Sequence, residues 1–143
     1  LELLLNALKY TLSVIVVTKT WISNNKPFLY ILNGYDFMNI PSDTRAGGTG
    51  VFIKSDFPYT IQTDLDFNLN SVEDLWLEIT LADQSKLTIG SIYRHPSYSF
   101  MEFKEKLLQN IEILNFIERM FALEKYNKDI VRPFFDYGWV FVH

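Results

Sequence analysis

Hydrophobic and polar positions predict several strands in the first two thirds of the chain. Residues 13–18 (SVIVVT) form a continuous β-branched run, which is typical of a strand buried on both faces, so we expect this strand to be central in its sheet. Residues 86–94 (KLTIGSIYR) predict another strand. Residues 74–81 alternate in two sets, Leu75, Leu77 and Ile79 on one face and Trp76, Glu78 and Thr80 on the other.

Shorter apolar stretches and turn residues complete this pattern. Strands are predicted at 34–40 and at 50–55, and the segment between them, 41–50 (PSDTRAGGTG), contains a proline and three glycines that predict a turn. The polar segment 82–85 (ADQS) predicts a hairpin turn between two of the strands.

Helical spacing appears at the two ends of this strand region. Leucines in the first ten residues fall on one helical face. From Ser99 onward the apolar residues recur at helical spacing, and Ser99 with Glu102 matches a capping box. We expect this helix to continue towards Leu123. The rest of the chain to His143 shows no period.

This order predicts an α/β layered domain with a mixed sheet of about five strands, covered by helices on one face. At 143 residues, 48% hydrophobic and 16% aromatic, the chain is long and apolar enough for one folded domain. Its net charge of −4 gives no general attraction for nucleic acid. The absence of cysteine excludes disulfides and thiolate chemistry.

Localisation is predicted from the same features. The first ten residues, LELLLNALKY, lack a basic start and a cleavage site, and they are too short to span a bilayer. We therefore expect a cytoplasmic or nuclear protein that is not secreted and has no membrane partner. The chain starts without methionine inside an apolar stretch, which suggests that upstream residues are missing.

Four motifs in consistent order resemble the endonuclease domain of LINE-type retrotransposons, in the endonuclease/exonuclease/phosphatase superfamily. They are TKTW at 18–21, RAGGTGVFIK at 45–54, DLWLEI at 74–79 and IGSIYRHPS at 89–97. The resemblance covers residues 1 to about 115. It implies a two-layer β-sandwich flanked by helices, with DNA as partner and magnesium as cofactor for nicking a phosphodiester.

Lys19 departs from the family pattern at the position that matters most. The family has a glutamate there that holds the catalytic cation. Magnesium requires oxygen ligands, and an ammonium group repels it. At an effective dielectric near 20, two unit charges about 4 Å apart interact by roughly 4 kcal/mol. Replacing a negative side chain by a positive one therefore strongly disfavours binding of a divalent cation. A structural alternative is that Lys19 simply extends from a strand end into water.

Other positions match the family's phosphate-contacting residues. Tyr93 corresponds to the tyrosine beside the scissile phosphate, and Ser97 to a common asparagine. Arg94 and His95 resemble the family's YR-x-P sequence, although a histidine before a proline is more often an ordinary loop residue. Arg45 begins the family's glycine turn, for which a structural role is favoured over a phosphate site because no helix follows.

Several family elements are absent. The family's first strand would precede Leu1, its Gly-Asp-Phe-Asn signature does not follow the predicted helix, and its Ser-Asp-His segment is missing. Asp129, Asp136 and His143 lack the family context. One tyrosine does not provide the several groups that hydrolysis needs around a phosphate.

We therefore interpret the chain as a truncated, degenerate endonuclease domain, with residues 1–115 as its N-terminal half and 116–143 as a divergent tail of unassigned structure. We expect it to be inactive, to bind no metal and to bind DNA weakly or not at all. An alternative is a non-catalytic binding or assembly module that self-associates through an exposed sheet face or strand edge. A third is an active nuclease with substitute ligands from Asp36, Asp43 or Glu78.

Overall fold

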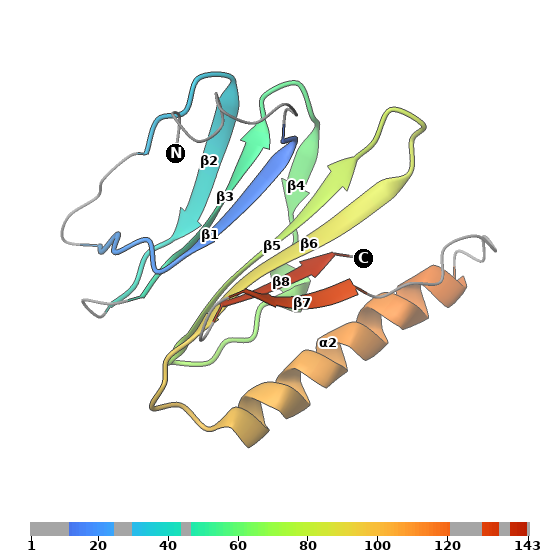
Figure 1. The fold of residues 1–143 in the computed structure, drawn as a ribbon. Helices are drawn as coiled ribbons and strands as arrows, with labels where there is room; N and C mark the ends of the chain where they lie inside the picture. The colour runs from blue at the N-terminus through green and yellow to red at the C-terminus, as the bar shows by residue number, and fades with distance from the viewer. Residues whose placement is uncertain (1–11, 25–29, 44–46, 121–129, 135–137, 143) are drawn as a thin grey trace.

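The protein forms two antiparallel sheets and one long helix in layers (Figure 1). The computed structural model describes residues 12–24, 30–43, 47–120, 130–134 and 138–142, with side chains described up to Leu114. The first sheet has the order β1-β3-β2 and the second β4-β5-β6-β8-β7. The elements are β1 (Val14–Thr18), β2 (Tyr35–Ile40), β3 (Thr49–Lys54), β4 (Tyr59–Ile61), η1 (Thr63–Leu65), β5 (Val72–Thr80), β6 (Lys86–Arg94), α2 (Phe100–Met120), β7 (Ile130–Phe134) and β8 (Gly138–Val142).

The two sheets pack face to face as a sandwich. Alternation along β5 directs Leu75, Leu77 and Ile79 towards the first sheet, where they meet Val51 and Ile53 of β3. The core between the sheets is thus aliphatic, as the alternating pattern of this strand predicts.

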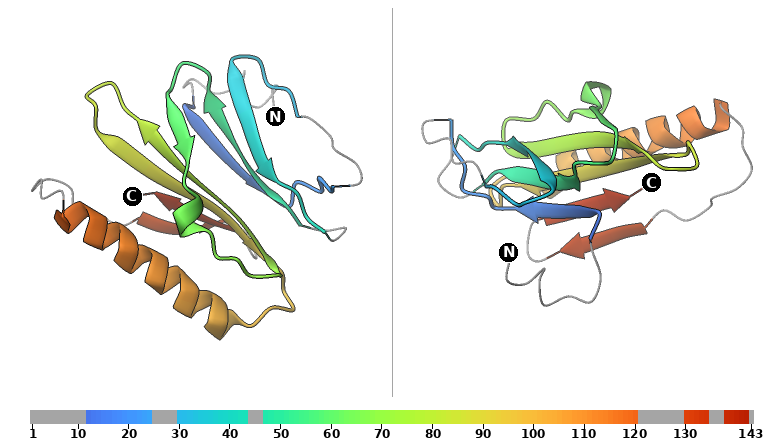
Figure 2. Two further views of the ribbon diagram at one scale, coloured as in Figure 1. Left: turned by 180° about the vertical axis from the view of Figure 1, so that it is seen from behind. Right: turned by 90° about the horizontal axis from the view of Figure 1, so that it is seen from above.

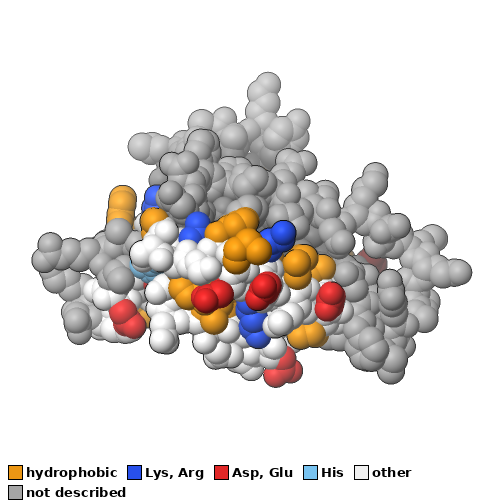
Figure 3. Space-filling view, turned by 90° about the horizontal axis from the view of Figure 1, so that it is seen from below, with side chains coloured by type: hydrophobic (Ala, Val, Ile, Leu, Met, Phe, Trp, Pro, Cys, Tyr) orange, Lys and Arg blue, Asp and Glu red, His pale blue; other side chains and the backbone are white. Residues whose placement is uncertain are grey.

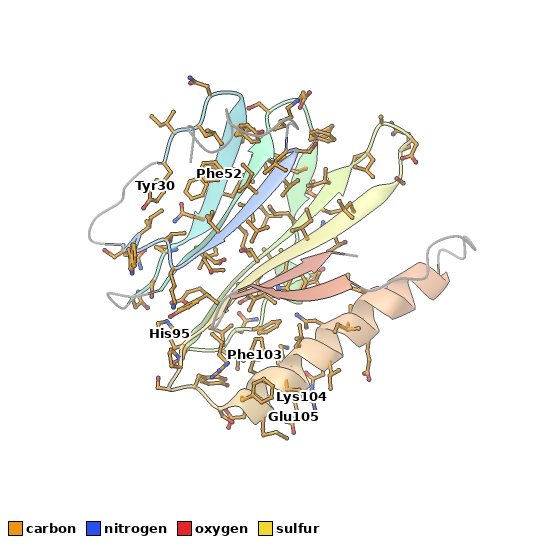
Figure 4. The ribbon with its side chains drawn as sticks, in the orientation of Figure 1. Tyr30, Phe52, His95, Phe103, Lys104 and Glu105 are labelled. Carbon is orange, nitrogen blue, oxygen red and sulfur yellow. The ribbon has the colours of Figure 1, made fainter. Side chains whose placement is uncertain are left out.

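The opposite face of the second sheet packs against α2. Trp76 and Ile92 are fully buried there with Phe67 and Phe103. Figure 4 labels Phe103 on this side of the molecule and Phe52 on the first sheet. Ser99 Oγ accepts a hydrogen bond from Glu102 N–H at 3.4 Å, which agrees with the predicted cap of α2. The helix begins at Phe100.

Two predictions about the sheets are wrong. The strand at 13–18 is not central: among the described strands, β1 lies at the edge of its sheet and pairs with β3 alone, because a β-branched run indicates burial but not the number of neighbours. The sheets are also not mixed, since every strand pair in the described ranges is antiparallel. Short turns such as 81–85 join successive strands in opposite directions.

The structure also adds elements to the predicted set. Eight strands are described where about five were expected. Part of the tail forms β7 and β8, and β8 extends the second sheet by pairing with β6. The predicted N-terminal helix and Leu123 lie outside the described residues. Within the described ranges, no helix combines the length and the apolar character needed to cross a bilayer.

Asp74 lies on the face of the second sheet that packs against α2, and burial of its charge lowers the free energy of unfolding. Its Oδ2 accepts hydrogen bonds from Phe67 N–H at 2.9 Å and Trp76 Nε1–H at 2.8 Å. Burial raises the pKa of Asp74 to about 6, against the opposing effect of these two bonds. The folded protein therefore holds this proton more tightly than the unfolded chain does. The unfolding free energy falls as pH rises from near 4 to about 6, and it stays reduced above that window.

We expect Asp74→Asn to remove this loss, because asparagine keeps an acceptor oxygen without the charge. At pH 7 the variant should be more stable than the parent by up to about 3 kcal/mol, and the two should converge near pH 4. Urea unfolding across this pH range measures the difference. Asp83→Asn is the control of opposite sign, because hydrogen bonds from Ser85 lower the pKa of Asp83. Equal stability of the Asp74 variant and the parent at pH 7 would contradict the assignment.

Candidate functional site

Four strands meet at one end of the sandwich (Figure 1). They are β1 and β6 with their C-terminal residues, and β3 and β5 with their N-terminal residues. This end, called the polar end here, carries Thr20, Ser42, Thr49, Glu73, Ser91 and His95, with the glycines Gly47 and Gly48 between them. Thr49 and Ser91 hydrogen-bond across the two sheets through their hydroxyl groups. Two of the predicted site residues, Lys19 and Tyr93, lie at this end.

Lys19 follows β1 directly at this end. Its side chain is exposed and its backbone is left-handed, with φ 55°. Trp21 is also left-handed, with φ 53°, and is 68% exposed. A left-handed backbone costs an L-residue roughly 1–2 kcal/mol, so other contacts must hold this loop.

The glycine turn supplies those contacts. Thr20 N–H donates to Gly48 O at 3.3 Å, and Trp21 N–H donates to Gly47 O at 3.0 Å. A Cβ on Gly47 would lie 2.3 Å from Ser42 Oγ, and one on Gly48 would lie 2.4 Å from Thr20 Oγ1. Gly48 is also left-handed, with φ 87°. These glycines are present because the backbone approaches its neighbours closely, in agreement with a structural role for the turn.

Glu73 is the centre of the polar end. Its Oε1 accepts a hydrogen bond from Ser42 Oγ at 2.6 Å and lies 2.8 Å from His95 Nε2. Ser42 is fully buried, and the side chains of Glu73 and His95 are only 11% and 12% exposed. Figure 4 labels His95 beyond the end of β6. One carboxylate thus connects the loop after β2, strand β5 and the loop after β6.

Two buried oxygen atoms of the polar end, Glu73 Oε2 and Thr20 Oγ1, have no hydrogen-bond partner among the residues that the structure describes. An unpaired buried acceptor costs about 1–3 kcal/mol. Sequence reasoning did not select Glu73, Ser42 or Thr20. The signal for Glu73 was present, because alternation places it on the same face as Leu75 and Leu77, and an acid on a core-facing position requires a partner.

The residues predicted to contact phosphate have different surroundings in the structure. Tyr93 is 1% exposed, and its ring meets the ring of His95 edge-on at 5.1 Å between centroids. Arg94 Nη1 donates to the carbonyls of Tyr98 at 2.5 Å and of His95 at 3.2 Å, and its guanidinium lies 5.8 Å from the centre of the Phe100 ring. Arg94 therefore holds the turn between β6 and α2.

The other predicted site residues are placed less tightly. Ser97 is exposed in the turn that Arg94 holds. Arg45 lies outside the described residues, as do Asp129 and Asp136.

The proposed substitute ligands lie apart from the polar end or are engaged elsewhere. Asp36 accepts a hydrogen bond from Ser55, Asp43 accepts one from Asn24, and Glu78 forms a 2.6 Å ion pair with Lys86. In the part of the chain that is described, no group of three or more histidine, aspartate or glutamate residues could hold a metal ion. Among its described residues, the polar end brings together the carboxylate of Glu73 and the imidazole of His95.

Comparisons of the chain with protein-family models, curated proteins and solved structures give no match. The resemblance to LINE-type endonucleases therefore stays a prediction.

We expect Glu73→Ala to destabilise the protein by roughly 2–4 kcal/mol, because it removes the carboxylate oxygen that contacts both the buried Ser42 hydroxyl and His95 Nε2. Glu78→Ala on the same strand is the matched control. Its ion pair with the exposed Lys86 is worth at most about 1 kcal/mol. Urea unfolding of both variants tests the difference, and equal losses would show that the Glu73 contacts contribute no more than a surface pair.

Proposed function

We propose that the chain is a catalytically inactive relative of the LINE-type endonucleases, with the layered architecture of that superfamily kept and its metal chemistry lost. The observation that carries the proposal is the position of Lys19. A cation follows β1 at the same end of the sandwich as Tyr93 and His95, where the resemblance expects a metal-binding glutamate.

The charges of the polar end support this proposal. Hydrolysis of a phosphodiester with a divalent cation needs several oxygen ligands around the ion. Glu73 is the buried carboxylate of the polar end, and one of its oxygens is already engaged with Ser42 and His95. An ammonium group near the site would oppose a divalent cation rather than hold it.

The fold is compatible with the same proposal. Two packed sheets with a helix on the outer face of one of them are what the resemblance implies for this part of the domain. Tyr93, however, lies in the core at 1% exposure, so its hydroxyl does not face solvent as a phosphate-binding group should. DNA binding is therefore proposed to be weak or absent, in accord with the net charge of −4.

We expect the purified protein to leave supercoiled plasmid intact in the presence of magnesium or manganese. Conversion to the open circular form should not exceed that of a heat-denatured sample, because the proposal assigns the chain neither the groups that activate water nor those that bind metal. Agarose gel electrophoresis measures the conversion. Nicking that co-elutes with the protein and stops on adding EDTA would overturn the proposal.

Lys19→Glu should not restore nicking. The substitution returns a carboxylate to the end of β1, but a single added ligand does not complete an octahedral magnesium site. Isothermal titration with magnesium should show no saturable heat for the parent, for Lys19→Glu, or for the control Lys19→Gln. If Lys19→Glu cleaves the plasmid and the parent and Lys19→Gln do not, the other catalytic groups are intact and the proposal is wrong.

A second candidate function is a non-catalytic binding or assembly module. The unequal width of the two sheets favours it, because among the described strands β1 is the last of the first sheet while the second continues through β8 and β7. Strand edges of this kind pair with other chains unless they are protected.

A further inference from the structure

The core between the second sheet and α2, called the helix-side core here, has an ionisable group on an otherwise apolar face. Buried apolar side chains of the sheet, the loop before β5 and the helix form it: Leu65, Phe67, Val72, Trp76, Ile92, Phe103 and Leu114. Asp74 projects to the same face, two residues before Trp76 on β5 and opposite Ile92 on β6. Figure 2 shows α2 running along this face of the sheet.

The two hydrogen bonds to Asp74 come from the sheet and from the loop that leads into it. Trp76 belongs to β5, and Phe67 lies between η1 and β5. Both bonds favour the ionised carboxylate and lower its pKa, whereas burial raises the pKa and has the larger effect. The charge is therefore disfavoured by the cover over Asp74, and the bonds beneath that cover stabilise it.

Charged groups on the neighbouring elements change this balance little. Asp66, in the loop after η1, raises the pKa of Asp74, and Lys106 of α2 lowers it, but both effects are smaller than that of burial. On β6, Arg94 is engaged with the carbonyls of His95 and Tyr98 in the turn before α2.

The helix is attached to this face by contacts that do not involve the Asp74 carboxylate. Asn110 of α2 is buried and donates a hydrogen bond to Leu65 O. The Phe103 ring lies 5.7 Å from the ring of Phe67. Movement of α2 away from the sheet would break these contacts and hydrate Asp74, while its bonds to Phe67 N–H and Trp76 Nε1–H would stay in place.

The outer face of α2 is already in water. Phe100, Met101, Leu108 and Ile113 are exposed there, and Figure 3, which views the molecule from the side of α2, shows acidic and basic side chains among the hydrophobic ones. Among its described residues, α2 is therefore attached through its inner face, and the stability of that attachment depends on the helix-side core.

We propose that α2 is a pH-sensitive cover, and that ionisation of Asp74 favours an open state in which the helix moves away from the second sheet. In this state the carboxylate is hydrated and keeps its two bonds, and the apolar side chains beneath α2 become accessible. The inference goes beyond the proposed function and does not depend on endonuclease ancestry.

The direction of the pH effect follows from burial. The closed state holds the Asp74 proton more tightly, because burial raises the pKa of Asp74 to about 6, and a hydrated aspartate has a pKa near 4. The preference for the closed state is fully present below about pH 4 and is lost as pH rises through about 6. The open population should increase about tenfold between pH 5 and pH 7.

Thiol labelling tests this opening, because the chain contains no cysteine. Leu114→Cys places a thiol beneath α2, and Ile53→Cys places one between the two sheets, where movement of the helix does not expose it. Reaction with methyl methanethiosulfonate is corrected at each pH by the rate of the urea-unfolded chain. At pH 7 Leu114→Cys should react at least about tenfold faster than Ile53→Cys, and about tenfold faster than it does itself at pH 5.

Two second substitutions identify the group that titrates. Asp74→Asn should abolish the difference between pH 5 and pH 7 in Leu114→Cys. Glu78→Gln should leave it unchanged, because Glu78 is an acid on the same face of β5 that is paired with Lys86. Equal corrected rates for the two thiols, or a pH difference that persists in Asp74→Asn, would overturn the proposal.

If Leu114→Cys does not fold, amide hydrogen exchange makes the same comparison without a thiol. At pH 7 the amides of α2 should be less protected than those of β3 in the parent protein, and Asp74→Asn should restore their protection about tenfold or more. Equal protection of α2 and β3 at pH 7, or no change in Asp74→Asn, would overturn the proposal.

Discussion

Burial of the β5–β6 hairpin on both faces is the interaction on which the described structure depends. One face packs Leu75, Leu77 and Ile89 against β3, and the other packs Trp76 and Ile92 against α2. Gly90 allows this second packing, because a Cβ there would lie 2.5 Å from the Trp76 ring. Strands β4 and β8 pair with its two edges, and β1, β2 and β3 pack over one of its faces. The β5–β6 hairpin also fixes the geometry of the polar end, since Glu73 and Tyr93 are paired residues of these two strands.

The sequence predicts local structure more clearly than it predicts which strands pair with each other. The predicted strand at 86–94 coincides with β6, the turn at 82–85 joins it to β5, and α2 begins after Ser99 as its cap predicts. These features depend on alternation, turn residues and capping, all of which act within a few residues. The edge position of β1 depends on which strands pair, and the sequence VIVVT does not indicate how many strands pair with it.

The candidate site shows the same limit. The end of β1 and the glycine turn were identified as important, and they do lie together through Thr20 and Gly48. The Ser42–Glu73–His95 group was missed because its members are 31 and 22 residues apart, and only the register of two sheets brings them together. What the sequence did contain was an acid on the core-facing side of a strand.

The adjacent carboxylates Glu73 and Asp74 bear most directly on the proposed loss of metal chemistry. They point to opposite faces of β5, and each serves the fold. Glu73 joins Ser42 and His95 between the sheets, whereas Asp74 receives Phe67 N–H and Trp76 Nε1–H on the helix side. A metal site needs carboxylate oxygens that converge on one point and are free to bind. β5 places its two acids on different sides of a sheet, so even with the exposed cation of Lys19 removed they could not share an ion.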